Sequence, residues 1–97
     1  MNIEQLHRLF LESTGVATDT RSIRTNQLFF ALKGDNFNGN SFASQALQKG
    51  ASYAIIDEEE FAKDKEYILV DNVLKTLQDL ATYHRKQLNL PILAIKQ

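Results

Sequence analysis

The feature that most constrains the fold is a continuous apolar run, Leu28-Phe29-Phe30-Ala31-Leu32, inside the stretch from Asp19 to Phe42. Polar segments bound the run, residues 19–24 before it and residues 33–41 after it. A short apolar run without alternation is typical of a strand that is buried on both faces of a sheet. We therefore expect a central strand that holds two polar loops, and these loops are the best candidates for a binding site.

The rest of the chain predicts an α/β framework around this strand. Helices are expected over residues 2–13, from about residue 42 to 49, and from about 73 to 88, and further strands over residues 16–19, 52–56, 67–70 and 92–95. Helical crossovers favour parallel pairing of the central strands. We predict the fold class as α/β, with a small mixed or mostly parallel sheet flanked by helices, in a single domain over residues 1–97.

Capping residues and apolar spacing define the predicted helices. Asn2 with Gln5 forms a capping-box pattern before the first helix. Asn40 or Ser41 is expected to cap the second helix, and Asp71 or Asn72 the third. The predicted inward residues of the second helix are Phe42, Ala43, Ala46 and Leu47, and those of the third are Val73, Leu77, Leu80, Ala81, His84 and Leu88. His7 is interpreted as a structural or simply exposed residue rather than a ligand, and His84 as a packed or boundary residue rather than a catalytic one.

The last residues predict a helix break followed by one more strand. Asn89-Leu90-Pro91 should end the third helix, and Ile92 to Ile95 is again apolar. Only Lys96 and Gln97 follow. A buried strand in this position either ends the sheet or belongs to a larger protein that continues.

Composition and motifs exclude several classes of function. A net charge of −1 gives no reason to expect nucleic acid, whose binding usually needs a basic patch. The absence of cysteine excludes a disulfide framework or a thiolate metal site. No apolar run is long enough to span a membrane, and no signal peptide is visible. The phosphate loop GxxxxGK[ST], GxGxxG, HExxH and GxSxG are all missing from the sequence. The acidic run from Asp57 to Glu60 is interpreted as a solvated helix start or loop rather than a metal site. With these motifs missing, no catalytic residue and no metal ligand is predicted.

The two polar loops carry the residues that suit an anionic ligand. Thr20, Arg21 and Ser22 offer two hydroxyls and a forked cation, a combination that binds phosphate oxygens. Residues 38–41 read Asn-Gly-Asn-Ser before a helix, where free N–H groups favour an anion and Gly39 would let a ligand approach the backbone. The alternative interpretation is that both segments are ordinary loops with capping residues.

At these residues the chain resembles a known family. Asp19-Thr20-Arg21, the run from Leu28 to Gly34, residues 37–42 (Phe-Asn-Gly-Asn-Ser-Phe), Ala46, Gly50-Ala51 and the strand Ala54-Ile55-Ile56 together resemble the N-terminal domain of the Mur ligases. The resemblance extends from about Ile3 to Ile95. It implies a cytoplasmic, ATP-dependent ligase that joins an amino acid or a dipeptide to a UDP-N-acetylmuramoyl peptide during peptidoglycan synthesis, with the N-terminal domain holding the UDP end.

The resemblance also implies which residues line the UDP-sugar site. Thr20 and Arg21 match the segment that lines the uridine diphosphate, and Lys33 and Gly34 match the turn after the central strand. Residues 38–42 match a segment that usually reads Asp-Gly-His-Asp-Phe, so Asn38, Asn40 and Ser41 replace an acid, a histidine and a second acid. The expected substrate-binding residues are Thr20, Arg21, Ser22, Lys33, Gly34, Asn38, Gly39, Asn40, Ser41 and Phe42.

The family's other domains are implied to lie beyond this segment. Residues 91–95 look like the strand that leads into the ATP-binding loop, TGSNGKT, of the central domain, with Lys96-Gln97 at the start of that loop. The chain is then expected to be cut just before the central domain, which would bind ATP and Mg²⁺, while a C-terminal domain helps to bind the incoming amino component. No cofactor is expected in this segment itself. A small α/β module that binds another protein is the alternative interpretation.

Overall fold

The structure is a computed structural model that describes the backbone of residues 1–95 and the side chains of residues 1–88. Four parallel strands form one sheet in the order β1 (Val16–Ala17), β2 (Leu28–Phe30), β3 (Tyr53–Ile56) and β4 (Tyr67–Leu69). The register pairs Val16 with Leu28, Phe29 with Ala54, and Ile55 with Ile68. The predicted α/β class is confirmed, and the sheet is parallel throughout the described residues.

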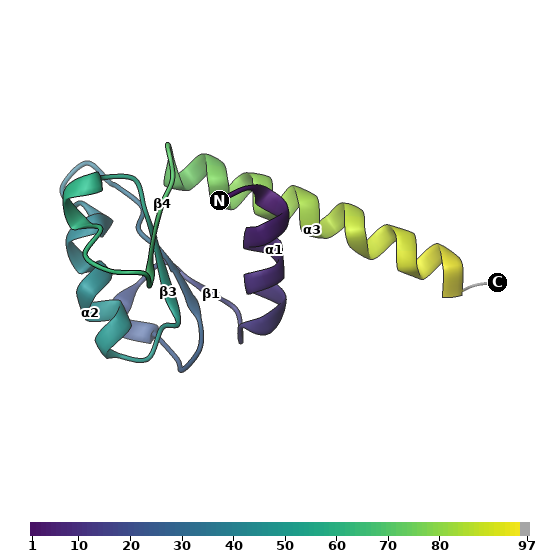
Figure 1. Cartoon of the computed structure of the whole chain (residues 1–97), viewed down its shortest axis with the longest axis horizontal. Coiled ribbons are helices and arrows are strands. Elements are labelled where there is room, and N and C mark those ends of the chain that lie inside the picture. The colour runs from purple at the N-terminus through teal and green to yellow at the C-terminus, as the bar shows by residue number, and fades with distance from the viewer. Residues whose placement is uncertain (96–97) are drawn as a thin grey trace.

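Helices cover both faces of this sheet (Figure 1). α1 (Ile3–Glu12) and α3 (Val73–Ile95) lie on one face, and α2 (Ala43–Gln48) lies on the other. Short 3₁₀ turns complete the connections: η1 (Thr20–Ser22), η2 (Gly39–Phe42) and η3 (Glu59–Phe61). Strand β2 is therefore buried on both sides, which is why its sequence does not alternate.

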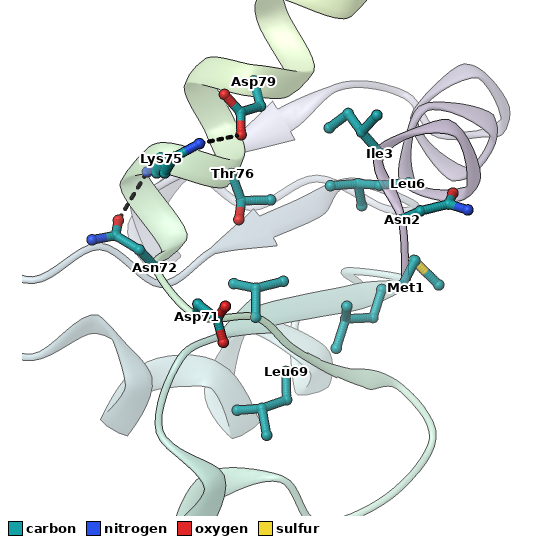
Figure 2. Close-up of a pocket in the computed structure, with 12 residues that line it drawn as sticks. Met1, Asn2, Ile3, Leu6, Leu69, Asp71, Asn72, Lys75, Thr76 and Asp79 are labelled. Carbon is teal, nitrogen blue, oxygen red and sulfur yellow. Dashed lines mark hydrogen bonds and ion pairs between the residues drawn. The ribbon is translucent and has the colours of Figure 1, made fainter.

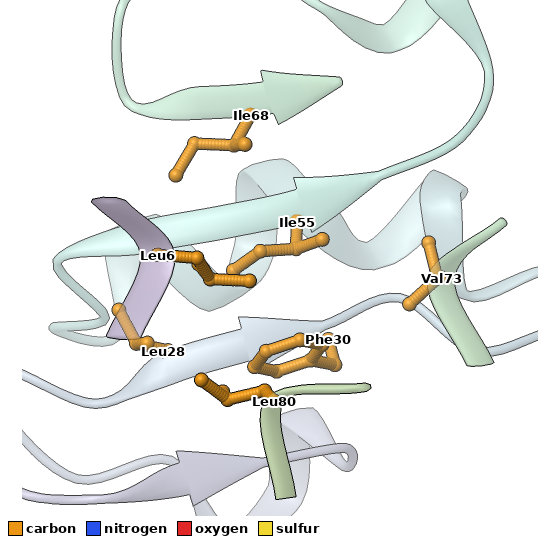
Figure 3. Close-up of a cluster of buried hydrophobic side chains, with 7 residues drawn as sticks. All are labelled: Leu6, Leu28, Phe30, Ile55, Ile68, Val73 and Leu80. Atoms are coloured by element: carbon orange, nitrogen blue, oxygen red, sulfur yellow. The ribbon is translucent and has the colours of Figure 1, made fainter. Parts of the chain in front are cut away.

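Alternate side chains of the central strands enter two separate cores. Leu28, Phe30 and Ile55 pack against α1 and α3 in the larger core, which also holds Leu6, Ile68, Val73 and Leu80 (Figure 3). Phe29, Ala31 and Ile56 face α2, whose Ala43 and Ala46 let the helix approach the sheet closely. Both cores are built mainly from aliphatic and phenyl groups, so burial of apolar surface stabilises the fold.

The caps predicted for the first and third helices are confirmed. The Asn2 side chain accepts a hydrogen bond from the Gln5 N–H at 2.8 Å, and the Gln5 side chain accepts one from the Asn2 N–H at 3.0 Å. At the start of α3, Asn72 accepts from the Lys75 N–H at 2.9 Å. The second helix differs, because Asn38 rather than Asn40 or Ser41 caps the turn η2 that leads into α2.

The prediction for residues 89–95 is wrong. Instead of breaking at Asn89-Leu90-Pro91 and forming a strand over 92–95, the chain continues as helix to Ile95. A strand needs a neighbouring sheet edge for its N–H and C=O groups, and α3 extends well past the end of the sheet (Figure 1). Continued helical bonding satisfies those groups without a neighbour. The loop expected to begin at Lys96-Gln97 lies outside the described residues.

Two of the predicted inward residues of α3 are exposed. Val73 and Leu80 are buried and Leu77 packs against the larger core, as predicted. Ala81 is exposed, and 49% of Leu88 is accessible. Both residues lie on the correct face of the helix, but α1 does not reach far enough along α3 to cover them.

The two histidines form a direct contact between α1 and α3. His7 is buried, with 8% of its surface accessible, and its Nε2 lies 3.0 Å from Nδ1 of His84. Phe10 and Tyr83 pack edge-on against the pair. The structural interpretation of both histidines agrees with this arrangement. One shared proton is enough to hold the contact, because one ring donates and the other accepts.

This histidine pair predicts a loss of stability in mild acid. Burial, and then the neighbouring His84, lower the pKa of His7, so the unfolded chain binds a proton more readily than the folded one. Stability should be fully present above the unfolded pKa of about 6.5 and fall as the pH drops through the lowered folded pKa. Urea unfolding followed at pH 7.5 and 5.5 checks this. In His7→Gln the decrease between these two pH values should be smaller; an equal decrease would assign the effect to other groups.

Candidate functional site

The carboxyl ends of parallel strands meet at one edge of the sheet, and both predicted loops lie there. The segment after β1 carries Asp19, Thr20 and Arg21, and the segment after β2 carries residues 33–42. Between them is a hollow of about 540 Å³. Its lining residues are Thr18, Asp19, Thr20, Arg21, Phe29, Phe37, Gly39, Phe42 and Gln45. Ligands of parallel α/β sheets commonly bind at this edge.

One wall of the hollow is the turn that follows β1. Asp19 accepts a hydrogen bond from the Arg21 N–H at 2.8 Å and pairs with its guanidinium at 2.7 Å. The hydrogen bonds from Arg21 hold the pKa of Asp19 down at about 2, so this ion pair persists through neutral pH. Lys49, from the end of α2, donates to the Thr20 carbonyl at 2.9 Å. Arg21 and Lys49 together give this turn one positive charge more than the Asp19 carboxylate balances, so the turn favours an anion.

The other wall is aromatic. Phe37 is 56% accessible and Phe42 is 40% accessible, and both rings line the hollow. The inward position predicted for Phe42 is therefore wrong: its ring does not enter the core beneath α2. Exposed phenyl rings beside a cationic turn can hold a planar ring system while the cations hold an attached anionic group.

Four of the predicted site residues come together at this hollow: Thr20, Arg21, Gly39 and Phe42. The remaining six, Ser22, Lys33, Gly34, Asn38, Asn40 and Ser41, do not line it. Ser22 and Ser41 donate hydrogen bonds to nearby backbone carbonyls, those of Asp19 and Asn38. Gly34 closes the turn after β2 by donating its N–H to the Phe37 carbonyl at 2.9 Å.

Asn38, Asn40 and Lys33 join a polar network beneath the hollow. Asn40 is 1% accessible; its amide donates to Asn38 and Asp57, and accepts from the backbone N–H groups of Asp57 and Glu58. Lys33 pairs with Glu58 at 2.6 Å and Asp57 at 3.3 Å. The interpretation of Asp57 and Glu58 as part of a solvated run is wrong, because both acids take part in this network.

The network also holds Asp57 ionised and connects the turn η2 to α3. Burial raises the pKa of Asp57, but hydrogen bonds from Asn40, from the Val73 N–H and from Lys33 outweigh burial, and the net shift is downward. The Asp57 carboxylate accepts from the Val73 N–H at 3.2 Å. The loop after β2, the end of β3 and the first turn of α3 are therefore held as one unit.

The backbone N–H groups at the start of η2 are used within the protein. Gly39 donates to the Leu32 carbonyl at 2.8 Å, Asn40 to the Asn38 side chain at 3.0 Å, and Ser41 to the Asn38 carbonyl at 3.1 Å. A Cβ on Gly39 would overlap the backbone of Ala31 and Leu32. Glycine is thus required here by close packing inside the chain, and the amides of residues 39–41 already have partners within the protein.

Sequence reasoning missed part of the lining, namely Thr18, Asp19, Phe29, Phe37 and Gln45. Phe37 stands in a turn-rich segment, where an aromatic ring is expected to be exposed. This expectation is the one signal that could have indicated Phe37 as a lining residue. Phe29 belongs to the buried strand, and Gln45 lies on α2, so only the packing of α2 against β2 brings them to the hollow.

A second hollow, of about 430 Å³, lies at the N-terminal end of α1, between Met1, Leu69 and the first turns of α3 (Figure 2). Its charged lining residues are Asp71, Lys75 and Asp79, and Lys75 is paired with Asp79 at 3.0 Å. Acidic groups dominate this hollow, so it does not suit an anionic ligand.

Within the described residues, no three His, Cys, Asp or Glu side chains gather as a metal site, and no helix is long and apolar enough to cross a membrane.

The fold and this edge define a three-layer α/β domain with an anion-favouring, aromatic-lined hollow at the carboxyl end of a parallel sheet. The sequence profile described as "Mur ligase family, catalytic domain" matches residues 12–86, and the chain belongs to the Mur ligase family.

Curated relatives and solved structures agree with this assignment. The UDP-N-acetylmuramoyl-tripeptide--D-alanyl-D-alanine ligase of Bacillus subtilis is 37% identical over 84% of this chain, and that of Buchnera aphidicola is 34% identical over 97%. The crystal structure of MurF ligase from Thermotoga maritima in complex with ADP superposes with a TM-score of 0.66, at 28% identity over 73% of this chain and 16% of the other. The chain spans 18% and 20% of the lengths of the two curated relatives.

Proposed function

We propose that this chain is the N-terminal unit of a peptidoglycan ligase and holds the UDP end of a UDP-N-acetylmuramoyl peptide. The observation that carries the proposal is the composition of the hollow, which combines the exposed rings of Phe37 and Phe42 with Arg21, in a turn that Lys49 also contacts. Family membership supports it, since the names of the relatives specify a UDP-N-acetylmuramoyl substrate.

In the proposed complex the two walls have separate roles. The uracil ring packs against Phe37 and Phe42, and the diphosphate lies beside Arg21 and Lys49. The Thr20 hydroxyl lines the same wall and can donate to a phosphate oxygen. The six predicted residues outside the hollow keep a supporting role, because they hold the two turns in position.

The proposed reaction of the complete ligase is the ATP-dependent addition of D-alanyl-D-alanine to the UDP-linked tripeptide. The alternative is addition of a diamino acid: 2,6-diaminopimelate ligases from Rickettsia typhi and Rickettsia prowazekii are each 32% identical to this chain. We assign ATP and Mg²⁺ to another domain, because none of the 97 residues forms a phosphate loop. The other domains of the ligase are the proposed protein partners, and the cytoplasm is the proposed location.

The proposal predicts selective binding of UDP that depends on Arg21. Titration of UDP into the chain, followed by amide chemical shifts, should move the signals of residues 18–21 and 37–42. Arg21→Ala should weaken binding about ten-fold, as expected for loss of one charge-assisted contact to phosphate. Arg24→Ala is the matched control, because Arg24 is exposed and does not line the hollow.

Two further ligands separate the two walls. Uridine should shift mainly the residues around Phe37 and Phe42, and inorganic pyrophosphate mainly those around Arg21 and Lys49. If UDP at millimolar concentration moves neither set, the site assignment is wrong. The alternative of a protein-binding module predicts this negative result, together with a reading frame that encodes no phosphate loop after this segment.

A further inference from the structure

An uncovered apolar groove lies on the face of the molecule formed by α1, β1 and α3. It has a volume of about 350 Å³ and is lined mainly by Phe10, Val16, Leu77, Ala81, His84 and Leu88. Leu77, Ala81, His84 and Leu88 recur at helical spacing, so they form a single stripe along α3. The first part of the stripe joins the larger core, and the later part is exposed.

The groove begins where the cover provided by α1 ends. Beside the groove, α1 meets α3 through Phe10, whose ring lies edge-on to His84 at 4.9 Å, and through the pair of His7 with His84. Beyond this point α3 continues to Ile95 and extends away from the sheet (Figure 1). Strand β1 supplies Val16 and forms an edge of the described sheet, since it pairs with β2 alone. No described element covers Ala81 or Leu88.

We propose that this groove docks the domain that adjoins α3 in the complete ligase; this rests on the proposed function. The relatives are about five times as long as this chain, so most of a family member lies outside the segment. A domain attached to the end of α3 stays close to the groove, so its effective concentration there is high. A small apolar contact is then sufficient for docking, because the two surfaces do not have to meet from free solution.

The chemistry of the groove describes the surface that occupies it. The lining is almost entirely apolar, and the exposed guanidinium of Arg85 lies among the lining residues. The adjoining domain therefore presents aliphatic or aromatic side chains, with an acidic group facing Arg85. A second copy of the chain is a poorer occupant, because a stable dimer needs about 20–30 residues from each partner and gains nothing from tethering.

Cysteine accessibility tests this docking. The 97 residues contain no cysteine, so Ala81→Cys places a single thiol in the groove. In the complete ligase, with any other cysteines replaced, this thiol should react with a maleimide at least ten-fold more slowly than in the 97-residue chain. Leu74→Cys is the matched control: Leu74 is an exposed residue of α3 outside the groove and should react equally in both proteins.

Each outcome decides the proposal. Slower reaction of Ala81→Cys in the complete ligase, partly reversed by Arg85→Glu, supports docking through an apolar and acidic surface. Equal rates in the two proteins overturn it. The proposal is overturned as well if the thiol of Ala81→Cys in the 97-residue chain reacts more slowly as the protein concentration rises, because a second copy of the chain then covers the groove. UDP titration of the same variants reports separately on the proposed function, because the groove shares no lining residue with the hollow that is proposed to bind UDP.

Discussion

Replacing Asn40 with alanine is expected to lower the free energy of unfolding by about 4 kcal/mol, a large part of the stability of a domain of this size. The Asn40 side-chain oxygen accepts from the N–H groups of Asp57 at 3.0 Å and Glu58 at 3.3 Å. Alanine leaves both donors without this partner, removes the hydrogen bonds to Asn38 and Asp57, and opens a small cavity. Urea unfolding of the wild type and the variant at pH 7 measures the loss.

Two further variants test whether the hydrogen bonds cause this loss. In the wild type, the Asn40 amide donates a hydrogen bond to the Asp57 carboxylate at 2.9 Å. Asn40→Asp keeps the shape of the side chain but places a second carboxylate beside that of Asp57. Two adjacent carboxylates raise the pKa of one of them, so the folded variant binds a proton more readily than the unfolded one, and part of its stability should return as the pH falls from 7 toward 5. Ser41→Ala, which removes one exposed hydrogen bond to the Asn38 carbonyl, should cost about 1 kcal/mol or less. A loss below about 1 kcal/mol in Asn40→Ala would contradict the role given to this network.

Replacing Gly39 with alanine is expected to cost about 3 kcal/mol, because the new methyl group meets backbone atoms. A Cβ at this position would lie 2.7 Å from the Ala31 carbonyl carbon and the Leu32 nitrogen, and even closer to the Leu32 carbonyl oxygen. These atoms belong to the backbone directly after β2 and cannot rotate away as a side chain can. The turn must shift, and the hydrogen bond from Gly39 to Leu32 is weakened with it.

Gly34→Ala is the matched control for this prediction. The atoms nearest to a Cβ there all belong to the ring of Phe37, which is half exposed and can turn into solvent. The cost should be about 1 kcal/mol or less, although rotation of Phe37 should alter UDP binding. Thermal unfolding of the two variants side by side measures the difference. Equal destabilisation would show that the backbone contact at Gly39 relaxes at little cost.

The central part of the fold was predictable because its signals are local. The apolar run around Phe29 predicts a doubly buried strand, and the structure places it as β2 at the centre of the sheet. The capping pair of Asn2 and Gln5 depends on residues three positions apart, so it could be recognised directly. The Mur ligase resemblance, carried by the loops beside β2, is confirmed by the family match over residues 12–86.

The errors all concern positions whose environment depends on distant segments. Asn40 and Ser41 are equally good caps by residue type, and only the approach of Asp57 and Glu58 takes Asn40 into the interior. Phe42 has the spacing of a core residue, but the turn η2 directs its ring to the hollow. The apolar residues 92–95 suit a strand or a helix, and no local signal tells whether a sheet edge is beside them.

By itself, the sequence determined the α/β class, the position of the central strand, the two polar loops that precede and follow it, and the family. Each of these depends on neighbouring residues, through apolar periodicity, capping and turn chemistry. Only the tertiary structure decided which loop residues face the hollow and which support it, and that the stripe on α3 is left uncovered. Contacts such as Lys33 with Glu58 or His7 with His84 join segments far apart in the chain, and their geometry exists only once the sheet and helices have packed.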